Sequence, residues 1–120
     1  MTRQSRIVFP RHLNSIGTFF GGEAMQWLDE VAFITATRYS RQRMVTVKAE
    51  NVRFLKPVVL DTILELVGSV VKTGQVRLFI KVEVFAESLY SEHREMVMDA
   101  DFVFVPCNDD LHPVPLKNPE

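Results

Sequence analysis

Residues 22–38 have the strongest helical character in the sequence, and their apolar side chains cover more than half of the helix circumference. At about 100° per residue, the remaining polar strip is narrow and consists of Glu23, Gln26, Glu30 and Thr37. Glu23 in the first turn and Arg38 near the last suit the helix dipole. A helix this apolar is expected to be wrapped by other structure, and not to lie on a surface.

The rest of the chain offers strands to wrap that helix. Residues 3–9 predict a short strand that Pro10 ends. After Arg43 the period changes from helix to strand. Four segments are rich in Val, Ile, Leu and Phe, at residues 44–54, 62–73, 76–87 and 94–105, and the third of them alternates cleanly. A hairpin is predicted at residues 72–75. The sequence therefore predicts an α+β fold with five antiparallel strands around one central helix.

The predicted strands also indicate how the chain is organised. Its 120 residues fit a single domain over 1–105, followed by a proline-rich extended segment over 106–120. The long strands carry apolar residues on both faces, and one helix can cover only one face. We therefore expect a homo-oligomer, because exposed apolar sheet promotes aggregation.

Charge and composition exclude several functions. A net charge of −1 lacks the basic excess of a general nucleic-acid binder. The apolar stretches are far shorter than the ~18–20 residues of a membrane span. Residues 1–6 lead into no apolar signal core, and the single cysteine cannot form an internal disulfide, so we expect a cytoplasmic protein. No His/Cys pair has the spacing of zinc ligands, so no metal is expected.

Asp29 is the first candidate for chemistry. On the predicted helix it lies beside Met25, Ala32 and Phe33, and no Lys or Arg stands one turn away to pair with it. A carboxylate on the rim of an apolar face is costly unless it is partnered from elsewhere, and such groups concentrate at active sites. The alternative is an ordinary aspartate on the polar strip, or one bonded to neighbouring backbone.

A second candidate precedes the helix. Asn14 and Gly17 are followed by Phe20-Gly21-Gly22, and glycines at a helix start leave backbone N–H groups open to an anion or a developing oxyanion. A plain glycine-rich turn is the alternative. A third candidate is a set of basic residues near turns, which could hold phosphates or simply be solvated strand ends: Arg53, Lys56, Lys72 and Arg77.

Motifs in a fixed order give these candidates a context. Along the chain stand Asn14-x-x-Gly17-x-x-Phe20-Gly21-Gly22, Trp27-Leu28-Asp29-Glu30, Val45-Thr46-Val47 and Phe54-Leu55-Lys56-Pro57-Val58. Over residues 7–105 the chain resembles the hotdog-fold acyl-CoA thioesterases, in particular the bacterial broad-range acyl-CoA hydrolases with Phe-Gly-Gly before the helix. The resemblance implies a homodimer with active sites at its interface, and further stacking into tetramers or hexamers.

The resemblance also implies roles for individual residues. Asp29 matches the carboxylate that activates water or attacks the thioester, and Thr46 matches a hydroxyl that supports the attacking water. The Asn14 amide would position the water or the thioester, and the Gly21 N–H would polarise the carbonyl. The coenzyme A end of the substrate would contact Gly22, Lys56, Lys72, Thr73, Gly74 and Gln75. No cofactor is implied, because coenzyme A is part of the substrate.

Two other functions remain open from the sequence. A hotdog hydratase or dehydratase would act on β-hydroxyacyl thioesters with a histidine and a carboxylate, and His12 lies near the loop before the helix. A non-catalytic acyl-CoA sensor would bind the same ligand without hydrolysing it. Neither the acyl-chain length nor the choice between dimer, tetramer and hexamer follows from the sequence.

Overall fold

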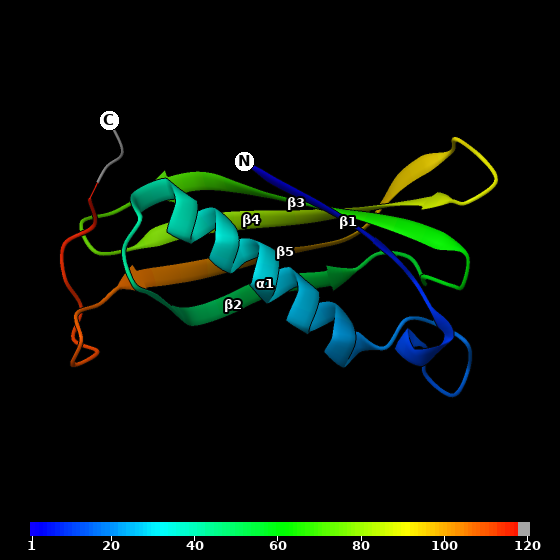
Figure 1. The fold of residues 1–120 in the computed structure, drawn as a ribbon, viewed down its shortest axis with the longest axis horizontal. Coiled ribbons are helices and arrows are strands. Elements are labelled where there is room, and N and C mark those ends of the chain that lie inside the picture. The colour runs from blue at the N-terminus through cyan, green and yellow to red at the C-terminus, as the bar shows by residue number, and fades with distance from the viewer. Residues whose placement is uncertain (118–120) are drawn as a thin grey trace.

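The computed structural model describes residues 1–117, which form one five-stranded antiparallel sheet with a single α-helix along one face (Figure 1). The strand order is β1-β3-β4-β5-β2, so β1 and β2 are the two edges of the sheet. The predicted α+β arrangement is therefore confirmed. Its elements are β1 (Thr2–Ile7), η1 (Pro10–His12), α1 (Gly21–Ser40), β2 (Met44–Phe54), β3 (Thr62–Thr73), β4 (Leu78–Ser88) and β5 (Arg94–Pro106).

The predicted bounds hold for β2 and β3 and differ by one or two residues for the other elements. β1 ends at Ile7 instead of Phe9, because the chain turns into the short helix η1 at Pro10. α1 is longer than predicted and ends where Arg41 adopts the left-handed conformation, with φ at 54°. The Arg41 N–H donates to the Thr37 carbonyl at 2.7 Å, which closes the last turn of the helix.

The helix packs closely on β3 because Gly68 has no side chain. A Cβ built on Gly68 would lie 2.3 Å from Thr35 Oγ1, so any larger residue would push the helix away from the sheet. The Thr35 hydroxyl donates to the Val31 carbonyl at 2.8 Å, which satisfies it within the core. The buried side of α1 consists of Ala24, Trp27, Leu28, Val31, Ala32, Thr35 and Ala36.

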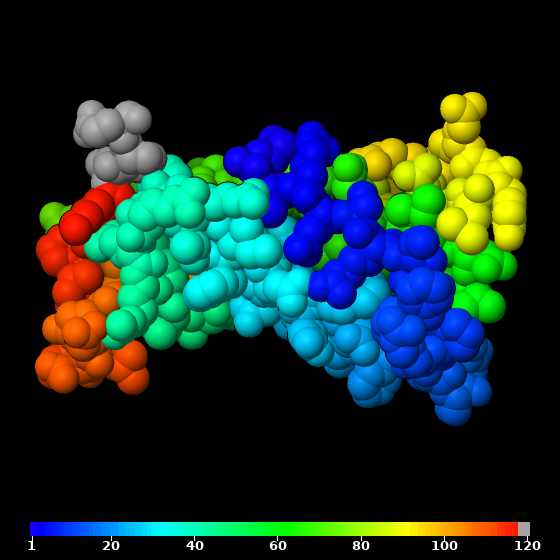
Figure 2. Space-filling view, in the orientation of Figure 1, coloured from blue at the N-terminus to red at the C-terminus, as the bar shows by residue number. Residues whose placement is uncertain are grey.

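The outward side of α1 is uncovered in the single chain, as Figure 2 shows along its length. Phe33 belongs to the apolar part of the helix circumference, yet 45% of its surface is exposed in the single chain. Trp27 and Thr35 are among the buried residues of the helix. The Phe33 ring lies 6.4 Å from that of Phe104 on β5, and Phe104 pairs with Thr46 of the edge strand β2, which also carries the exposed residue Val47.

The outer face of the sheet is more polar than the sequence pattern indicated. Its aromatic rings are shielded by long cationic side chains: Lys72 lies 4.6 Å from the ring of Phe79, and Arg94 lies 4.3 Å from that of Phe85. Arg94 also pairs with Glu65 across this face. Charged residues thus alternate with the apolar ones on the outer face of the sheet, at Lys81 and Glu83 between Phe79 and Phe85.

The segment after β5 folds back along the end of the molecule. Cys107 and Pro113 form an isolated bridge, and the Leu116 N–H donates to the Gln75 carbonyl at 2.8 Å. The last three residues of the predicted tail, 118–120, lie outside the described residues. The division between domain and tail at residue 105 stays a prediction, and β5 itself ends at Pro106. In the described part of the chain, no helix has the length and apolar character that a membrane crossing needs.

Candidate active site

Asp29 and Thr46 meet between the helix and the edge strand. The Thr46 hydroxyl donates to Asp29 Oδ1 at 3.0 Å, and both side chains are exposed in the single chain. The expectation that Asp29 is desolvated by its own chain is therefore wrong, because Asp29 is exposed and its neighbour Phe33 is also exposed. The exposed surface between α1 and β2, which includes Phe33 and Val47, is called the seam below. The bond orients one carboxylate oxygen, and Oδ2 has no hydrogen-bond partner among residues 1–117.

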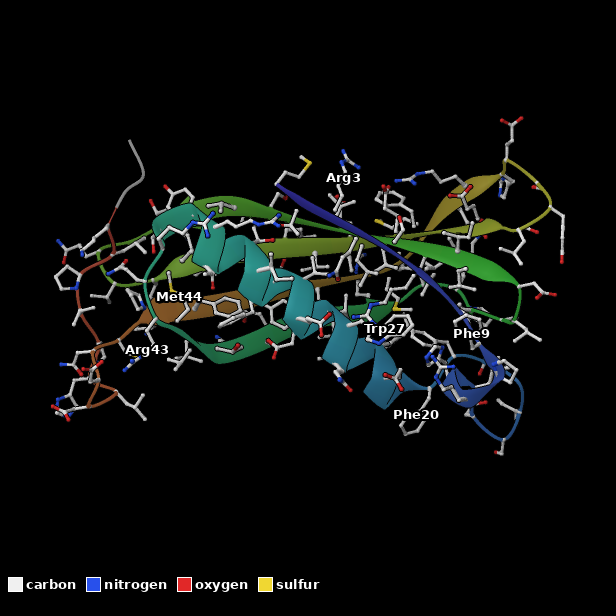
Figure 3. All side chains as sticks on the ribbon, viewed as in Figure 1. Arg3, Phe9, Phe20, Trp27, Arg43 and Met44 are labelled. Carbon is white, nitrogen blue, oxygen red and sulfur yellow. The ribbon has the colours of Figure 1, made fainter. Side chains whose placement is uncertain are left out.

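The start of α1 offers free backbone donors. Phe20 is the N-cap residue, makes no side-chain cap and projects outward (Figure 3). Within residues 1–117 the N–H groups of Gly21 and Gly22 have no hydrogen-bond acceptor. Gly21 lines a pocket of about 280 Å³, together with Thr18, Phe19, Phe54, Leu55, Lys56, Pro57, Val58 and Met98. This pocket combines an apolar wall with the donors at the helix start.

Gly21 and Asp29 of one chain cannot hold the same small reacting group. They are eight residues apart on one helix, which separates them by about 12 Å along its axis. An oxyanion donor and the group that activates water must both lie about 3 Å from the reacting atoms. The two residues can therefore serve one thioester only if they come from two protomers.

The Asn14 side chain organises its own loop. Its Oδ1 accepts the N–H groups of Ile16 and Thr18 at 3.0 and 3.1 Å, and its Nδ2 donates to the Thr18 hydroxyl at 2.8 Å. Gly17 completes the turn with φ at +83°, a value that glycine adopts without strain. The Phe19 N–H donates to the Val58 carbonyl at 2.7 Å, which fixes the end of this loop beside the pocket.

His12 is a structural residue of the same region. It is buried, its Nδ1 accepts the Phe9 N–H at 3.0 Å, and its ring packs 5.0 Å from that of Trp27. Trp27 lies where β1 crosses the first turns of α1 (Figure 3), and the Arg6 guanidinium stacks 4.6 Å from its ring. Because one nitrogen of His12 is bonded to backbone and the ring is enclosed by aromatic residues, His12 lacks the access of a catalytic acid or base.

The residues expected at the coenzyme A end fall into two separate groups. Lys56 lines the pocket at the helix start, and its Nζ pairs with Glu95 Oε2 at 2.6 Å. The turn at 72–75 follows the far end of β3, and Lys72 covers the outer face there. Along the sheet, Lys56 is level with Val97 of β5, whereas Lys72 is level with Phe79 and Val103, so about six strand residues, or about 20 Å, separate the two groups. The residues expected at the coenzyme A end therefore do not form one cluster within a single chain.

Sequence reasoning missed a buried ion cluster on the outer face. Asp99 is 1% exposed, and its Oδ1 accepts the Arg53 Nε–H at 2.8 Å, while Lys81 lies 3.4 Å from Oδ2. The hydrogen bond from Arg53 holds the pKa of Asp99 below its usual range, and the same contact raises the pKa of Arg53. The sequence does contain a signal for this cluster. Asp99 and Asp101 stand two residues apart in an apolar strand, which places both on one face.

Comparison with known proteins decides the family. Residues 16–92 match the thioesterase superfamily, which is more than half of the chain. The chain belongs to the thioesterase superfamily. An uncharacterized acyl-CoA thioester hydrolase of Bacillus subtilis, YkhA, is 33% identical over 109 residues, covering 91% of this chain and 63% of the relative. The chain thus spans less than two thirds of that protein's length.

Solved structures of this superfamily share the whole fold. A hexameric thioesterase from Yersinia pestis superimposes with a TM-score of 0.88 and 28% identity, covering 96% of this chain and 93% of that one. An acyl-CoA hydrolase from Staphylococcus aureus, solved with butyryl coenzyme A and coenzyme A, superimposes with a TM-score of 0.91 and 28% identity. The match covers 98% of this chain and 71% of that one. The hotdog fold implied by the sequence motifs is confirmed.

Proposed function

We propose that this protein hydrolyses acyl-CoA thioesters to a free acid and coenzyme A. The observation that carries the proposal is the Asp29–Thr46 pair, a carboxylate held by a hydroxyl on the open side of the central helix. A thioester is already activated for acyl transfer, so hydrolysis needs only a carboxylate, an oxyanion donor and a groove for the acyl chain. Asp29, the Gly21 N–H and the apolar seam by Phe33 and Val47 supply these three.

The spacing of the pair supports these roles. Two further structures of the Staphylococcus aureus hydrolase carry alanine in place of an aspartate and of a threonine, and those positions are 17 residues apart in that protein. Asp29 and Thr46 are also 17 residues apart. The same two residue types therefore recur at the same separation in a relative that was solved with an acyl-CoA.

The site would form between two protomers. The outer edge of β2 pairs with no other strand of the described chain, and next to it lie the exposed apolar side chains of Phe33 and Val47. A second copy that pairs along β2 would cover this edge and extend the sheet. The 12 Å that separate Gly21 from Asp29 along one helix favour the same arrangement, with the donor from one protomer and the carboxylate from its partner. The hexameric Yersinia pestis relative favours further stacking of such dimers.

The chemical roles follow from the hydrogen bonds. The Thr46 O–H donates to Asp29 Oδ1, so Oδ2 remains to take a proton from water or to attack the thioester carbon. The Gly21 N–H would donate a hydrogen bond to the carbonyl oxygen as negative charge develops on it in the tetrahedral intermediate. Asn14 has used both lone pairs of its Oδ1 inside the loop, so only its second Nδ2–H can reach water or substrate.

The coenzyme A end would lie toward Gly22 and Lys56 of one protomer and toward the turn Lys72, Thr73, Gly74 and Gln75 of another. The hydratase alternative is disfavoured because His12, its expected acid or base, is enclosed in the aromatic cluster. A sensor would keep the fold and the ligand but release no free thiol.

A thiol-release assay distinguishes these functions. A panel of acyl-CoA substrates is incubated with the protein, and free coenzyme A is measured with a thiol reagent. Hydrolysis by the wild type that falls at least ~10²-fold in Asp29→Asn supports the proposal, since that variant keeps the size and removes the reacting group. A folded wild type that binds acyl-CoA without releasing thiol would contradict it.

A further inference from the structure

We propose that Glu95 holds Lys56 in an ion pair that must open when coenzyme A binds, and that Glu95 thereby sets the affinity for the coenzyme A end of the substrate. This inference rests on the proposed function, because it takes Lys56 as a contact of the coenzyme A phosphates. It assigns a role to a residue, Glu95, that lies outside the thioesterase motifs of the sequence.

The pair is built by two neighbouring strand ends. The Leu55 N–H donates to the Val97 carbonyl at 2.8 Å, which ties the segment after β2 to β5. Glu95 stands two residues before Val97 on β5, which places it close to Lys56. Its Oε2 is 2.6 Å from Lys56 Nζ. His93 Nε2 approaches the same carboxylate oxygen at 3.5 Å. Lys56 is thus fixed at the rim of the pocket that Gly21 lines, with its charge already compensated.

The compensation matters because acidic residues balance the basic ones over the protein as a whole, with 14 Lys and Arg against 15 Asp and Glu. Net charge is −1, so phosphates are bound only by local basic residues. In the free protein a phosphate that approaches Lys56 meets the Glu95 carboxylate as well. The hydrogen bond from Lys56 lowers the pKa of Glu95, so this carboxylate stays ionised at neutral pH and the ion pair persists. Binding of coenzyme A therefore exchanges the ion pair between Lys56 and Glu95 for one between Lys56 and a phosphate.

Such an exchange suits a hydrolase. The phosphate end of coenzyme A is the same in substrate, transition state and product, so tight binding there would lower KM and retain the product without speeding the chemical step. A competing carboxylate weakens the binding of substrate, transition state and product equally. Removing it should tighten coenzyme A and lower KM, with kcat unchanged or reduced by slower product release.

The test uses Glu95→Gln, with Glu92→Gln as the matched control. Glu92 is exposed, carries the same charge three residues away and forms no ion pair in the part of the chain that the structure describes. The Kd of coenzyme A is measured by calorimetry at low and high salt for the wild type, both variants, Lys56→Ala and the double variant Lys56→Ala/Glu95→Gln. KM and kcat are measured on one acyl-CoA.

We expect Glu95→Gln to tighten coenzyme A about two- to five-fold at low salt, the range of an exposed ion pair, and less at high salt. Glu92→Gln should have a smaller effect, and the gain from Glu95→Gln should disappear when Lys56 is alanine. An unchanged Kd in Glu95→Gln, or an equal gain without Lys56, would overturn the inference. If coenzyme A tightens as expected but no variant hydrolyses acyl-CoA, the proposed function fails while the role of Glu95 stands.

Discussion

Replacing Gly21 by proline should remove a single backbone donor from the proposed site and leave the fold intact. Gly21 is the first residue of α1, where the N–H has no intrahelical acceptor and proline is well tolerated. The preceding residue, Phe20, has φ −71° and ψ 128°, which is the extended conformation that a residue before proline requires. A Cβ at Gly21 meets no atom within 4 Å.

The expected effects on stability and activity are opposite in sign. Proline at a compatible position restricts the unfolded chain, so the free energy of unfolding should stay the same or rise by about 0.4–1 kcal/mol. Loss of one oxyanion donor should lower kcat about 10²–10³-fold, equivalent to about 2.7–4 kcal/mol of transition-state stabilisation. Urea unfolding and the thiol-release assay measure the two quantities on the same preparation.

Gly21→Ala is the matched control, because it adds a Cβ in the same open space and keeps the N–H. We expect it to retain most of the wild-type kcat. A folded Gly21→Pro protein that hydrolyses acyl-CoA at the wild-type rate would refute the oxyanion role. An alanine variant as inactive as the proline variant would show that bulk at this position, and not the donor, is what matters.

Three further predictions concern the assembly, the carboxylate and the outer face. Co-refolding inactive Asp29→Asn with inactive Gly21→Pro should restore about a quarter of the wild-type activity, since half of randomly paired dimers then hold one intact site; a site within one chain would restore none. Thr46→Val should lower kcat about 10- to 100-fold, because it removes the hydrogen bond to the Asp29 carboxylate. Thr46→Ser keeps the hydroxyl and should retain most of the wild-type kcat. Asp99→Asn should lower the free energy of unfolding by about 1–3 kcal/mol at pH 7 in urea, because Arg53 and Lys81 lose their buried partner. Since the pKa of Asp99 is lowered in the folded protein, that difference should persist above pH 3.8, the ordinary value, and vanish as the pH falls through the folded value; an equal loss at low pH would contradict it.

Much of the fold and part of the site could be predicted from local patterns. The change from helical to strand periodicity after Arg43, with runs rich in Val, Ile, Leu and Phe at residues 44–54 and 62–73, marked β2 and β3 to the residue. The position of Asp29 on the helix and the order of the motifs around Gly21 and Thr46 also come from the sequence, since they depend on spacing along the chain.

Partners from distant segments could not be predicted in this way. The bonds of Asp99 to Arg53 and of Glu95 to Lys56 join residues 46 and 39 positions apart, and only the pairing of β2 with β5 brings them together. The exposure of Phe33 has the same origin, because helical period identifies an apolar side chain but does not say which side of the helix the sheet covers.

The sequence by itself therefore determined the elements, their order and the residue types available for chemistry, because these depend on local backbone preference and on periodicity. The tertiary structure decided that Asp29 contacts Thr46, that His12 is enclosed by aromatic rings, and that Gly21 and Asp29 stand about 12 Å apart along one helix. Those facts depend on sheet register and helix placement, which are set by the packing of all five strands at once and not by any single segment.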